Sequence, residues 1–137
     1  MQSTERFTAE TTLHIRYAET DAMGITHHAA YIVFFEEGRS AYARQRGYPY
    51  SNVEKDGYFL TVTEINARYI KPAVYDQQIT IKTQISEMKS RAMTFEYEIV
   101  SAETGEKLVT GHSKHVCVTR DGRVARIPDI WRAWGDS

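Results

Sequence analysis

Residues Glu19–Arg39, ETDAMGITHHAAYIVFFEEGR, place an acidic side chain, a glycine and two histidines directly before a strongly apolar stretch. If a helix begins near His28, its first backbone N–H groups lack intrahelical acceptors and carry partial positive charge, which suits a developing oxyanion. Asp21 lies earlier, on a loop that Gly24 can turn back toward this helix end. A carboxylate beside an oxyanion site is the minimum apparatus for acyl transfer, because it can attack a carbonyl or deprotonate a water. From spacing alone, a local hydrogen-bonding turn is the more common role of such an aspartate.

Other side chains near this stretch are better explained as structure. The adjacent His27 and His28 would point about 100° apart on a helix, and no further metal-ligand spacing surrounds them, so we expect no metal site. Glu36 and Glu37 are alternative catalytic carboxylates. An exposed helix surface, with Glu36 paired to Arg39 at i, i+3, is the favoured explanation for both.

The last long strand of the sequence contains two histidines and the only cysteine. His112 and His115 fall on opposite faces of a strand, so they cannot serve one site unless a bulge intervenes. Cys117 lies in the apolar sequence HVCV and is expected to be a core thiol. One cysteine cannot form an intrachain disulfide, and the first residues lack a secretory signal pattern, so a cytoplasmic location is expected.

Asp21 must be positioned by a strand before it and a helix after it. Threonines and spaced apolar residues predict a strand over Phe7–Tyr17, followed by a loop around Ala22–Thr26. Apolar residues at intervals of three and four predict a helix over His28–Arg46, about 27 Å long. Gly38 falls on its apolar face, where a missing side chain would let the helix lie close against its neighbour.

The remaining sequence predicts four strands and a short terminal helix. Strands are expected over Tyr58–Ile70, Ile79–Ile85, Met93–Ile99 and Leu108–Arg120, a turn at Asp121–Arg123, and a helix started by Pro128. The last three strands are joined by short turns and should be antiparallel neighbours. The expected fold is one α+β domain over residues 1–137, an antiparallel five-stranded sheet wrapped round a long central helix. One chain covers this helix incompletely, so self-association is expected.

The composition excludes several functional classes. The chain has 17 basic and 18 acidic residues and a formal net charge of −1, so we expect no nucleic-acid partner. Its apolar runs are far shorter than the roughly 20 residues that cross a bilayer, so no membrane association is expected.

The stretch from Arg16 to Arg39 resembles the signature of the 4-hydroxybenzoyl-CoA thioesterase family, a branch of the hotdog fold with the pattern D-T-D-x-x-G-[IV]-x-x-[HY]-x-x-Y followed by F-x-E-x-x-R. The matching residues are Asp21, Gly24, His28, Tyr31, Phe34, Glu36 and Arg39. The resemblance extends to ARYIKPAVYDQQITI and HVCVTRDGRVARIP, and so covers most of the chain. The family's first aspartate is Glu19 here, a departure that concerns how the loop is held.

This resemblance implies a homodimer or homotetramer with its active site at the subunit interface, where an acyl-CoA thioester is hydrolysed to free acid and coenzyme A. Asp21 would be the nucleophile or general base. The backbone N–H of His28 would polarise the thioester carbonyl, and its side chain would orient water or the acid. Gly24 and Tyr31 would contribute to substrate binding. No metal or other cofactor is implied.

Coenzyme A phosphates need cationic groups near the pocket mouth. Lys89 and Arg91 are the candidates, with Lys71 or Arg120 less favoured, and a solvated turn charge is the default for each one singly. Two alternatives to hydrolysis stay open, a non-catalytic acyl-CoA-binding protein and a hotdog enoyl-CoA hydratase or dehydratase. Asp21 argues against the first, and the motif fits hydrolysis better than the second. The sequence leaves the acyl group open.

Overall fold

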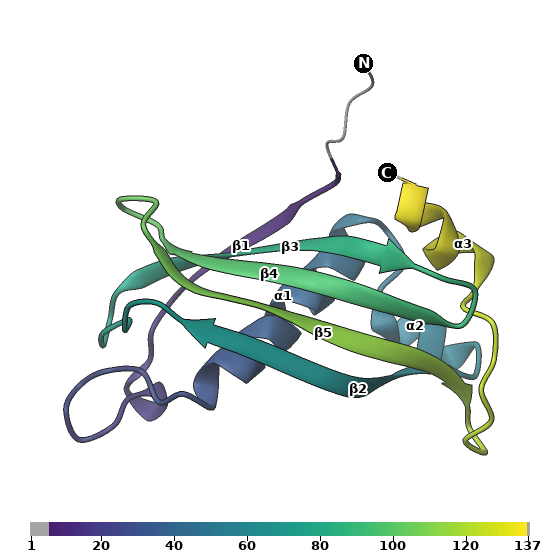
Figure 1. Cartoon of the computed structure of the whole chain (residues 1–137), viewed down its shortest axis with the longest axis horizontal. Helices are drawn as coiled ribbons and strands as arrows, with labels where there is room; N and C mark the ends of the chain where they lie inside the picture. Colours follow the sequence, from purple (N-terminus) through teal and green to yellow (C-terminus); the bar gives the residue numbers. More distant parts are fainter. Residues whose placement is uncertain (1–5, 137) are drawn as a thin grey trace.

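Five antiparallel strands form one sheet in the order β1-β3-β4-β5-β2, and one long helix lies across its inner face (Figure 1). The structure, a computed structural model, describes residues 6–136. The strands are β1 (Ala9–His14), β2 (Tyr58–Tyr69), β3 (Gln78–Met88), β4 (Ala92–Ser101) and β5 (Lys107–Thr119). The helices are α1 (Ala30–Gln45), α2 (Tyr50–Lys55) and α3 (Asp129–Arg132), with 3-10 turns at Tyr17–Glu19 and Ala133–Asp136. The predicted α+β class and the five-stranded sheet with a long helix are confirmed.

Alternating side chains build the centre of the sheet. Ile81 of β3 lies opposite Ile99 of β4, and Ile85 lies opposite Phe95, and all four side chains are buried. Thr83 and Tyr97, two positions further along each strand, face the core as well, and the residues that alternate with them, Lys82, Gln84, Glu96 and Glu98, face the other side of the sheet. β3, β4 and β5 are adjacent, as the short turns between them predicted.

Helix α1 lies unusually close to the sheet because Gly38 faces it. A Cβ atom added at Gly38 would lie 2.4 Å from Thr83 Oγ1 and 2.8 Å from Ile81 Cγ2. The prediction that this glycine permits a close approach is therefore confirmed. Phe35, one turn earlier, stacks on the ring of Tyr97 with centroids 4.3 Å apart.

The start of α1 and the end of β1 do not lie where the sequence predicted them. α1 begins at Ala30, not near His28, because residues 27–29 form a turn that uses the His27 side chain as an acceptor. The first strand ends at His14, not at Tyr17, since the chain then forms a 3-10 turn.

The short helix α2 was not predicted. It starts directly after Pro49, which is typical of a helix start, but its sequence YSNVEK is too short to show a helical period. The terminal helix α3 does start after Pro128, as predicted, and its Trp131 is fully buried. Within residues 6–136, no helix combines the length and the apolar character needed to cross a bilayer.

A chain of polar side chains lies buried between α1 and the sheet, and the sequence patterns did not reveal it. Arg39 Nη1 donates to the Tyr97 hydroxyl at 3.4 Å, that hydroxyl is 2.5 Å from Ser113 Oγ, and Ser113 Oγ is 2.7 Å from His115 Nε2. Burial, and secondarily the nearby charge of Arg39, lowers the pKa of His115 to about 4. His115 is therefore a neutral core residue near pH 7. His112 lies on the opposite face and contacts Glu64 at 2.9 Å, as the alternation predicted.

We expect Gly38→Ala to destabilise the fold despite the higher helix propensity of alanine. The new methyl group would overlap two short branched side chains of β3, and overpacking of this kind costs about 1–3 kcal/mol. The free energy of unfolding in urea measures the effect. Ser40→Ala, a half-buried change on the same helix, is the control and should stay within about 0.5 kcal/mol of the wild type. Equal stability of the Gly38→Ala variant would contradict the close packing.

We expect His115 to make the protein less stable in mild acid. From about pH 6.5 down to about pH 4, the unfolded chain binds a proton that the folded chain does not, so the free energy of unfolding falls as pH is lowered through this window, by up to about 3 kcal/mol. His115→Gln should lack this contribution. As the pH falls, the free energy of unfolding of the wild type should therefore decrease relative to that of the variant. Urea unfolding of both proteins across the window tests this. A gap that is independent of pH would show that His115 titrates normally in the fold.

Candidate active site

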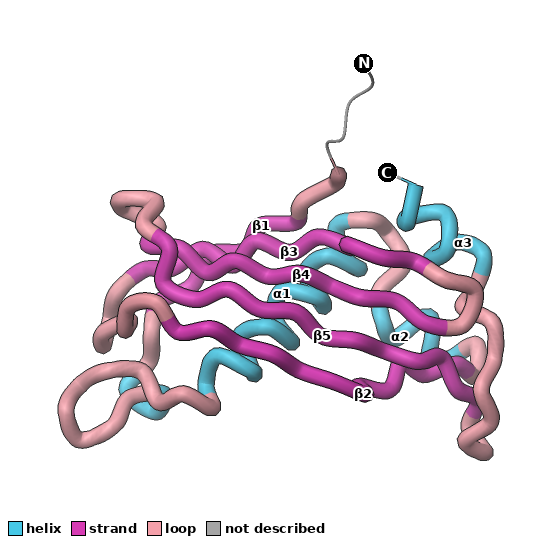
Figure 2. The backbone as a smooth tube through the Cα atoms, viewed as in Figure 1, coloured by secondary structure: helices cyan, strands magenta, loops and turns pink. Residues whose placement is uncertain are grey.

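The loop between β1 and α1 is folded into a tight turn that begins at Asp21 (Figure 2). The Asp21 N–H donates to the carbonyl of Ile25 at 2.9 Å, and the Gly24 N–H donates to the carbonyl of Asp21 at 3.0 Å. Gly24 has φ +78°, a conformation that residues with a side chain rarely adopt. The predicted turn at Gly24 is therefore present.

The Asp21 side chain is exposed, and only one of its oxygens is used by the turn. Oδ1 accepts a hydrogen bond from the Met23 N–H at 2.8 Å. Among the described residues, Oδ2 has no hydrogen-bond partner. The sequence left two roles open for Asp21, a hydrogen-bonding turn residue and a catalytic acid. The two roles are compatible, because one oxygen of the carboxylate binds the turn while the other is free.

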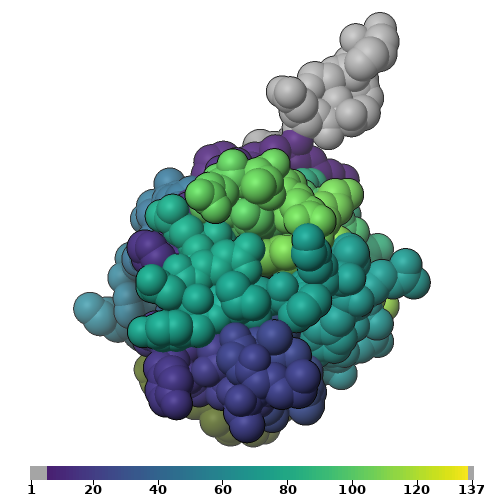
Figure 3. All heavy atoms as spheres, turned by 90° about the vertical axis from the view of Figure 1, so that its left-hand side faces the viewer, coloured from purple at the N-terminus to yellow at the C-terminus, as the bar shows by residue number. Residues whose placement is uncertain are grey.

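The loop is held against the segment that follows β2. The N–H and the hydroxyl of Thr26 both donate to the carbonyl of Ala73, at 2.8 and 2.9 Å, and the Tyr75 N–H donates to the carbonyl of Gly24 at 3.1 Å. Figure 3 looks onto this end of the molecule, where the indigo loop lies against the teal segment. The position of Asp21 thus depends on residues that are about fifty positions further along the chain.

Glu19 anchors the start of the loop. Its buried carboxylate accepts hydrogen bonds from the backbone N–H and from Nε of Arg16, each at 2.7 Å, and its carbonyl accepts from the His27 N–H at 2.7 Å. These contacts agree with the expectation that Glu19 affects how the loop is held in place.

The backbone N–H groups at the start of α1 are mostly satisfied locally. The Ala29 N–H donates to His27 Nδ1 at 3.2 Å, the Ala30 N–H to the His27 carbonyl at 2.9 Å, and the Tyr31 N–H to the His28 carbonyl at 3.4 Å. The His28 N–H has no acceptor among residues 6–136. Of these turn and helix-start donors, it is the one left for a ligand.

Asp21 and His28 are close because they belong to one hairpin-like loop. Thr20 and Thr26 form an antiparallel bridge. Asp21 lies one residue from this bridge on the side of the turn, and His28 lies two residues from it on the opposite side. At about 3.3 Å per step, the two Cα atoms are offset by about 10 Å along the loop.

A cleft of about 310 Å³ opens beside His28. Its lining includes Tyr31 of α1, Tyr69 at the end of β2, and residues of the segment that follows β2. The Tyr31 hydroxyl accepts from the Ala73 N–H at 3.1 Å, and the Tyr69 hydroxyl donates to the His28 carbonyl at 3.2 Å. Tyr31 is therefore both a wall of this cleft and an anchor of the loop.

The two adjacent histidines do not point apart as expected. They precede the helix, and their rings stack with centroids 4.4 Å apart and an interplanar angle of 26°. The argument from helical geometry therefore does not apply to His27 and His28. Within residues 6–136, no three histidine, cysteine or acidic side chains are grouped so as to hold a metal ion.

Lys89 and Arg91 do not lie near Asp21 in the same chain. They belong to the turn between β3 and β4, at the opposite end of the molecule from the start of α1 (Figure 1). Lys89 Nζ is 3.8 Å from Glu87, and Arg91 donates to Ser90 Oγ at 3.3 Å. Within one chain the acid and these cations therefore lie at opposite ends of the sheet.

A second cleft, of about 400 Å³, lies between α1, α2 and β2. Glu36, Glu37 and the buried Arg39 are among its lining residues, and Glu36 Oε2 is 3.6 Å from Arg39 Nη2. The predicted Glu36–Arg39 pair is therefore present.

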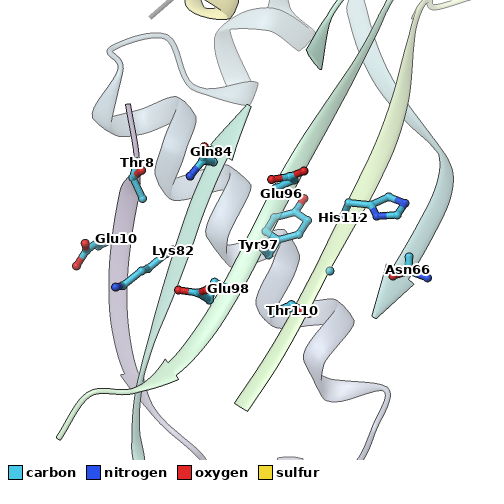
Figure 4. Close-up of a pocket in the computed structure, with 11 residues that line it drawn as sticks. Thr8, Glu10, Asn66, Lys82, Gln84, Glu96, Tyr97, Glu98, Thr110 and His112 are labelled. Carbon is cyan, nitrogen blue, oxygen red and sulfur yellow. The ribbon is translucent and has the colours of Figure 1, made fainter. Parts of the chain in front are cut away.

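A third hollow, of about 520 Å³, lies on the outer face of the sheet, on the side away from α1 (Figure 4). Ionisable side chains from four strands stand over it, Glu10, Lys82, Glu96, Glu98 and His112. The sheet separates this hollow from α1, so it is not part of the cleft beside His28.

Comparisons with known proteins agree with this architecture. Residues 15–135 match the sequence model of the Thioesterase-like superfamily. YneP of Bacillus subtilis, whose provisional name is acyl-CoA thioesterase, is 37% identical over 109 residues, which are 80% of this chain and 78% of YneP. The acyl-CoA thioester hydrolase YbgC of Escherichia coli is 29% identical over 91 residues, 66% of this chain and 68% of YbgC.

The fold is shared with solved structures. The crystal structure of a DHNA-CoA thioesterase from Staphylococcus aureus superposes with a TM-score of 0.86 at 31% identity, covering 94% of this chain and 87% of that protein. The predicted hotdog fold is confirmed. The relatives named above are thioesterases or thioester hydrolases, which is the enzyme class expected from the sequence. The chain belongs to the Thioesterase-like superfamily.

Proposed function

We propose that this protein is an acyl-CoA thioesterase, which hydrolyses an acyl-CoA thioester to the free acid and coenzyme A. Superfamily membership and the names of YneP and YbgC support the activity. The Asp21–Tyr31 motif supports placing the chain in the 4-hydroxybenzoyl-CoA thioesterase branch. The cytoplasmic location stays a prediction.

In the proposed reaction, Asp21 acts on the thioester carbonyl carbon, either by direct attack or by deprotonating the attacking water. The His28 N–H donates to the carbonyl oxygen as it becomes an oxyanion. The carbon–sulfur bond then breaks, and coenzyme A leaves as a thiolate, which needs no strong general acid. After direct attack, water hydrolyses the acyl-aspartate anhydride to the free acid and regenerates Asp21. After attack by water, the free acid forms at once and the proton taken by Asp21 passes to the thiolate or to solvent. No step requires a metal ion or another cofactor.

One observation carries this proposal. A single hydrogen-bonded loop holds both an exposed carboxylate with one free oxygen and a backbone N–H with no acceptor among the described residues, and the Cα atoms of the two residues are offset by about 10 Å along the loop. Fixed donors and a fixed acid next to a cleft are the features that acyl transfer needs, because they cost no reorganisation during the reaction.

We also propose that the active unit is a homodimer paired through β2. This strand of 12 residues pairs with β5 on one side and has no neighbouring strand on the other within the described chain. The other edge strand, β1, has 6 residues, and the Gln45 side chain donates to its Glu10 carbonyl at 3.1 Å. Long unpaired edges readily pair with another chain, and a two-fold symmetric contact would align two copies of β2 antiparallel.

This dimer would bring Lys89 and Arg91 to the site from the second chain. The β3–β4 turn lies at the same end of the sheet as the start of β2, since Ala92 pairs with Val116 and Phe59 pairs with Val118. When two β2 strands run antiparallel, the start of one lies beside the end of the other. The cations of one chain would then lie on the side of the partner's His28, where they could bind coenzyme A phosphates.

We expect Asp21→Asn to abolish thioester hydrolysis with the fold intact, since the amide can neither attack nor accept a proton. The kcat should fall by about 10³-fold or more, measured as free-thiol release over a panel of acyl-CoAs. Glu36→Gln and Glu37→Gln remove the alternative carboxylates and should leave most of the activity. Unchanged turnover by the Asp21→Asn variant, or loss of activity only in a Glu36 or Glu37 variant, would refute the assignment.

We expect the protein in solution to be a dimer, with twice the mass of one chain, or an assembly of such dimers. Sedimentation equilibrium measures this directly. Val62→Pro, in the middle of β2, removes a backbone donor and should weaken the assembly and the activity together. The matched change Val124→Pro, at an exposed site outside the five strands, should affect neither. A fully active monomer would rule out the proposed dimer.

A further inference from the structure

One side chain of the sheet reaches the turn that contains the His28 N–H. Tyr69 is the last residue of β2, and its hydroxyl donates to the His28 carbonyl at 3.2 Å. Within the described chain, every other hydrogen bond to the backbone of residues 27–29 is made with the same loop or with α1. Tyr69 is therefore the group that ties the backbone of this turn to the sheet.

The sheet holds the Tyr69 hydroxyl in a fixed place. Tyr69 pairs with Val109 of β5 at the end of the β2–β5 ladder. Its ring packs against the Tyr31 ring, with centroids 5.4 Å apart, and lines the cleft beside His28. A group that is carried by a strand and packed against a neighbour keeps its geometry better than a group on a loop. The hydroxyl can therefore hold the His28 backbone in one position.

The contact restrains the two peptide groups that meet at the Cα atom of His28. The His28 N–H belongs to the peptide group shared with His27, whose carbonyl already accepts a hydrogen bond of 2.9 Å. The His28 carbonyl belongs to the next peptide group, and the Tyr31 N–H donates to it only at 3.4 Å, which is long for a hydrogen bond. The shorter contact to this carbonyl is the one from Tyr69. If this carbonyl turned, the backbone dihedral angles of His28 would change, and its N–H would point elsewhere.

The direction of the His28 N–H matters most in the transition state. As the thioester carbonyl becomes an oxyanion, its attraction to an N–H donor grows, and a donor already aimed at the oxygen needs no reorganisation. In the proposed reaction, the coenzyme A part of the substrate does not use this N–H. A residue that orients the donor should therefore raise kcat and leave KM nearly unchanged.

We infer that Tyr69 is a positioning residue of the proposed thioesterase, whose hydroxyl fixes the His28 backbone so that the His28 N–H points to the thioester carbonyl oxygen. This inference rests on the proposed function, because Tyr69 acts only through the proposed oxyanion donor. The hydroxyl bonds to the protein backbone and not to the substrate, so Tyr69 is not itself a catalytic residue.

Tyr69→Phe tests the inference in the kinetics, because it removes the hydroxyl and keeps the ring. Tyr69 is half-exposed, so no buried group is left unpaired and the fold should stay intact. The kcat for the acyl-CoA that the wild type hydrolyses fastest should fall about 5- to 10-fold, with KM within about twofold of the wild type. Tyr48→Phe is the matched control. It removes another tyrosine hydroxyl that donates to a side chain, Asp56, beyond the far end of α1, and should leave both constants unchanged.

Tyr69→Leu separates the hydroxyl from the ring. It also removes a wall of the cleft, so KM should rise in addition to the fall in kcat. If Tyr69→Phe keeps the wild-type kcat and only Tyr69→Leu loses activity, Tyr69 is a wall of the cleft alone, and the inference is overturned. A higher KM with an unchanged kcat in Tyr69→Phe overturns it as well.

The stretching frequency of the thioester carbonyl reports the contact without hydrolysis. The same acyl-CoA, labelled with carbon-13 at this carbonyl, is bound to Asp21→Asn and to the double variant Asp21→Asn, Tyr69→Phe. A fixed donor polarises the carbonyl and lowers its infrared frequency relative to free acyl-CoA in buffer, and the lowering should be smaller in the double variant. An equal lowering in both proteins overturns the inference and leaves the proposed function standing. No lowering in either protein refutes the His28 N–H as the oxyanion donor, and the inference falls with it.

Discussion

The depth at which α1 lies on the sheet is the constraint on which the rest of the structure depends. Gly38 offers no side chain where the helix meets Ile81 and Thr83, and Gly111 of β5 offers none where the Phe35 ring meets the sheet. A Cβ atom at Gly111 would lie 2.7 Å from that ring. With a glycine on each surface, the helix is fixed in position against the strands, and its first turn is fixed at one end of the sheet. The Asp21 loop and both clefts beside α1 take their places from this contact.

The loop before α1 combines a structural and a proposed chemical role. The bonds that close it use the backbone of Asp21, one oxygen of its carboxylate, and the carboxylate of Glu19. The same bonds leave one Asp21 oxygen without a donor and the His28 N–H without an acceptor among the described residues. Local turn formation and reactivity are therefore not competing explanations of the aspartate, because the turn is what would hold the reactive oxygen in place.

Much of the fold could be predicted from the sequence because its strongest signals are local. The alternation of Ile79, Ile81 and Ile85, and the helical spacing of Phe34, Gly38 and Tyr42, each report one face of one element. The start of α1 was misplaced because the acceptor for the Ala29 N–H is a side chain, His27, which a hydrophobic period does not record. α2 was missed because six residues cannot show a period.

The candidate site was less accessible to sequence reasoning. The order of Asp21, Gly24 and His28 predicted one loop, but the segment that holds it, around Ala73, is distant in sequence. The buried chain from Arg39 through Tyr97 and Ser113 joins three elements, so no single motif contains it. The positions of Lys89 and Arg91 relative to Asp21 depend on the assembly of two chains, which no pattern within one chain specifies.

The most direct test of the central claim is a crystal structure of the dimer with a non-hydrolysable acyl-CoA analogue that keeps the carbonyl group. The account predicts that the carbonyl oxygen lies about 2.7–3.2 Å from the His28 nitrogen, and that an Asp21 carboxylate oxygen lies about 3–3.5 Å from the carbonyl carbon or is joined to it by one water. A carbonyl group bound at Glu36 or Glu37, with Asp21 facing solvent, would contradict it.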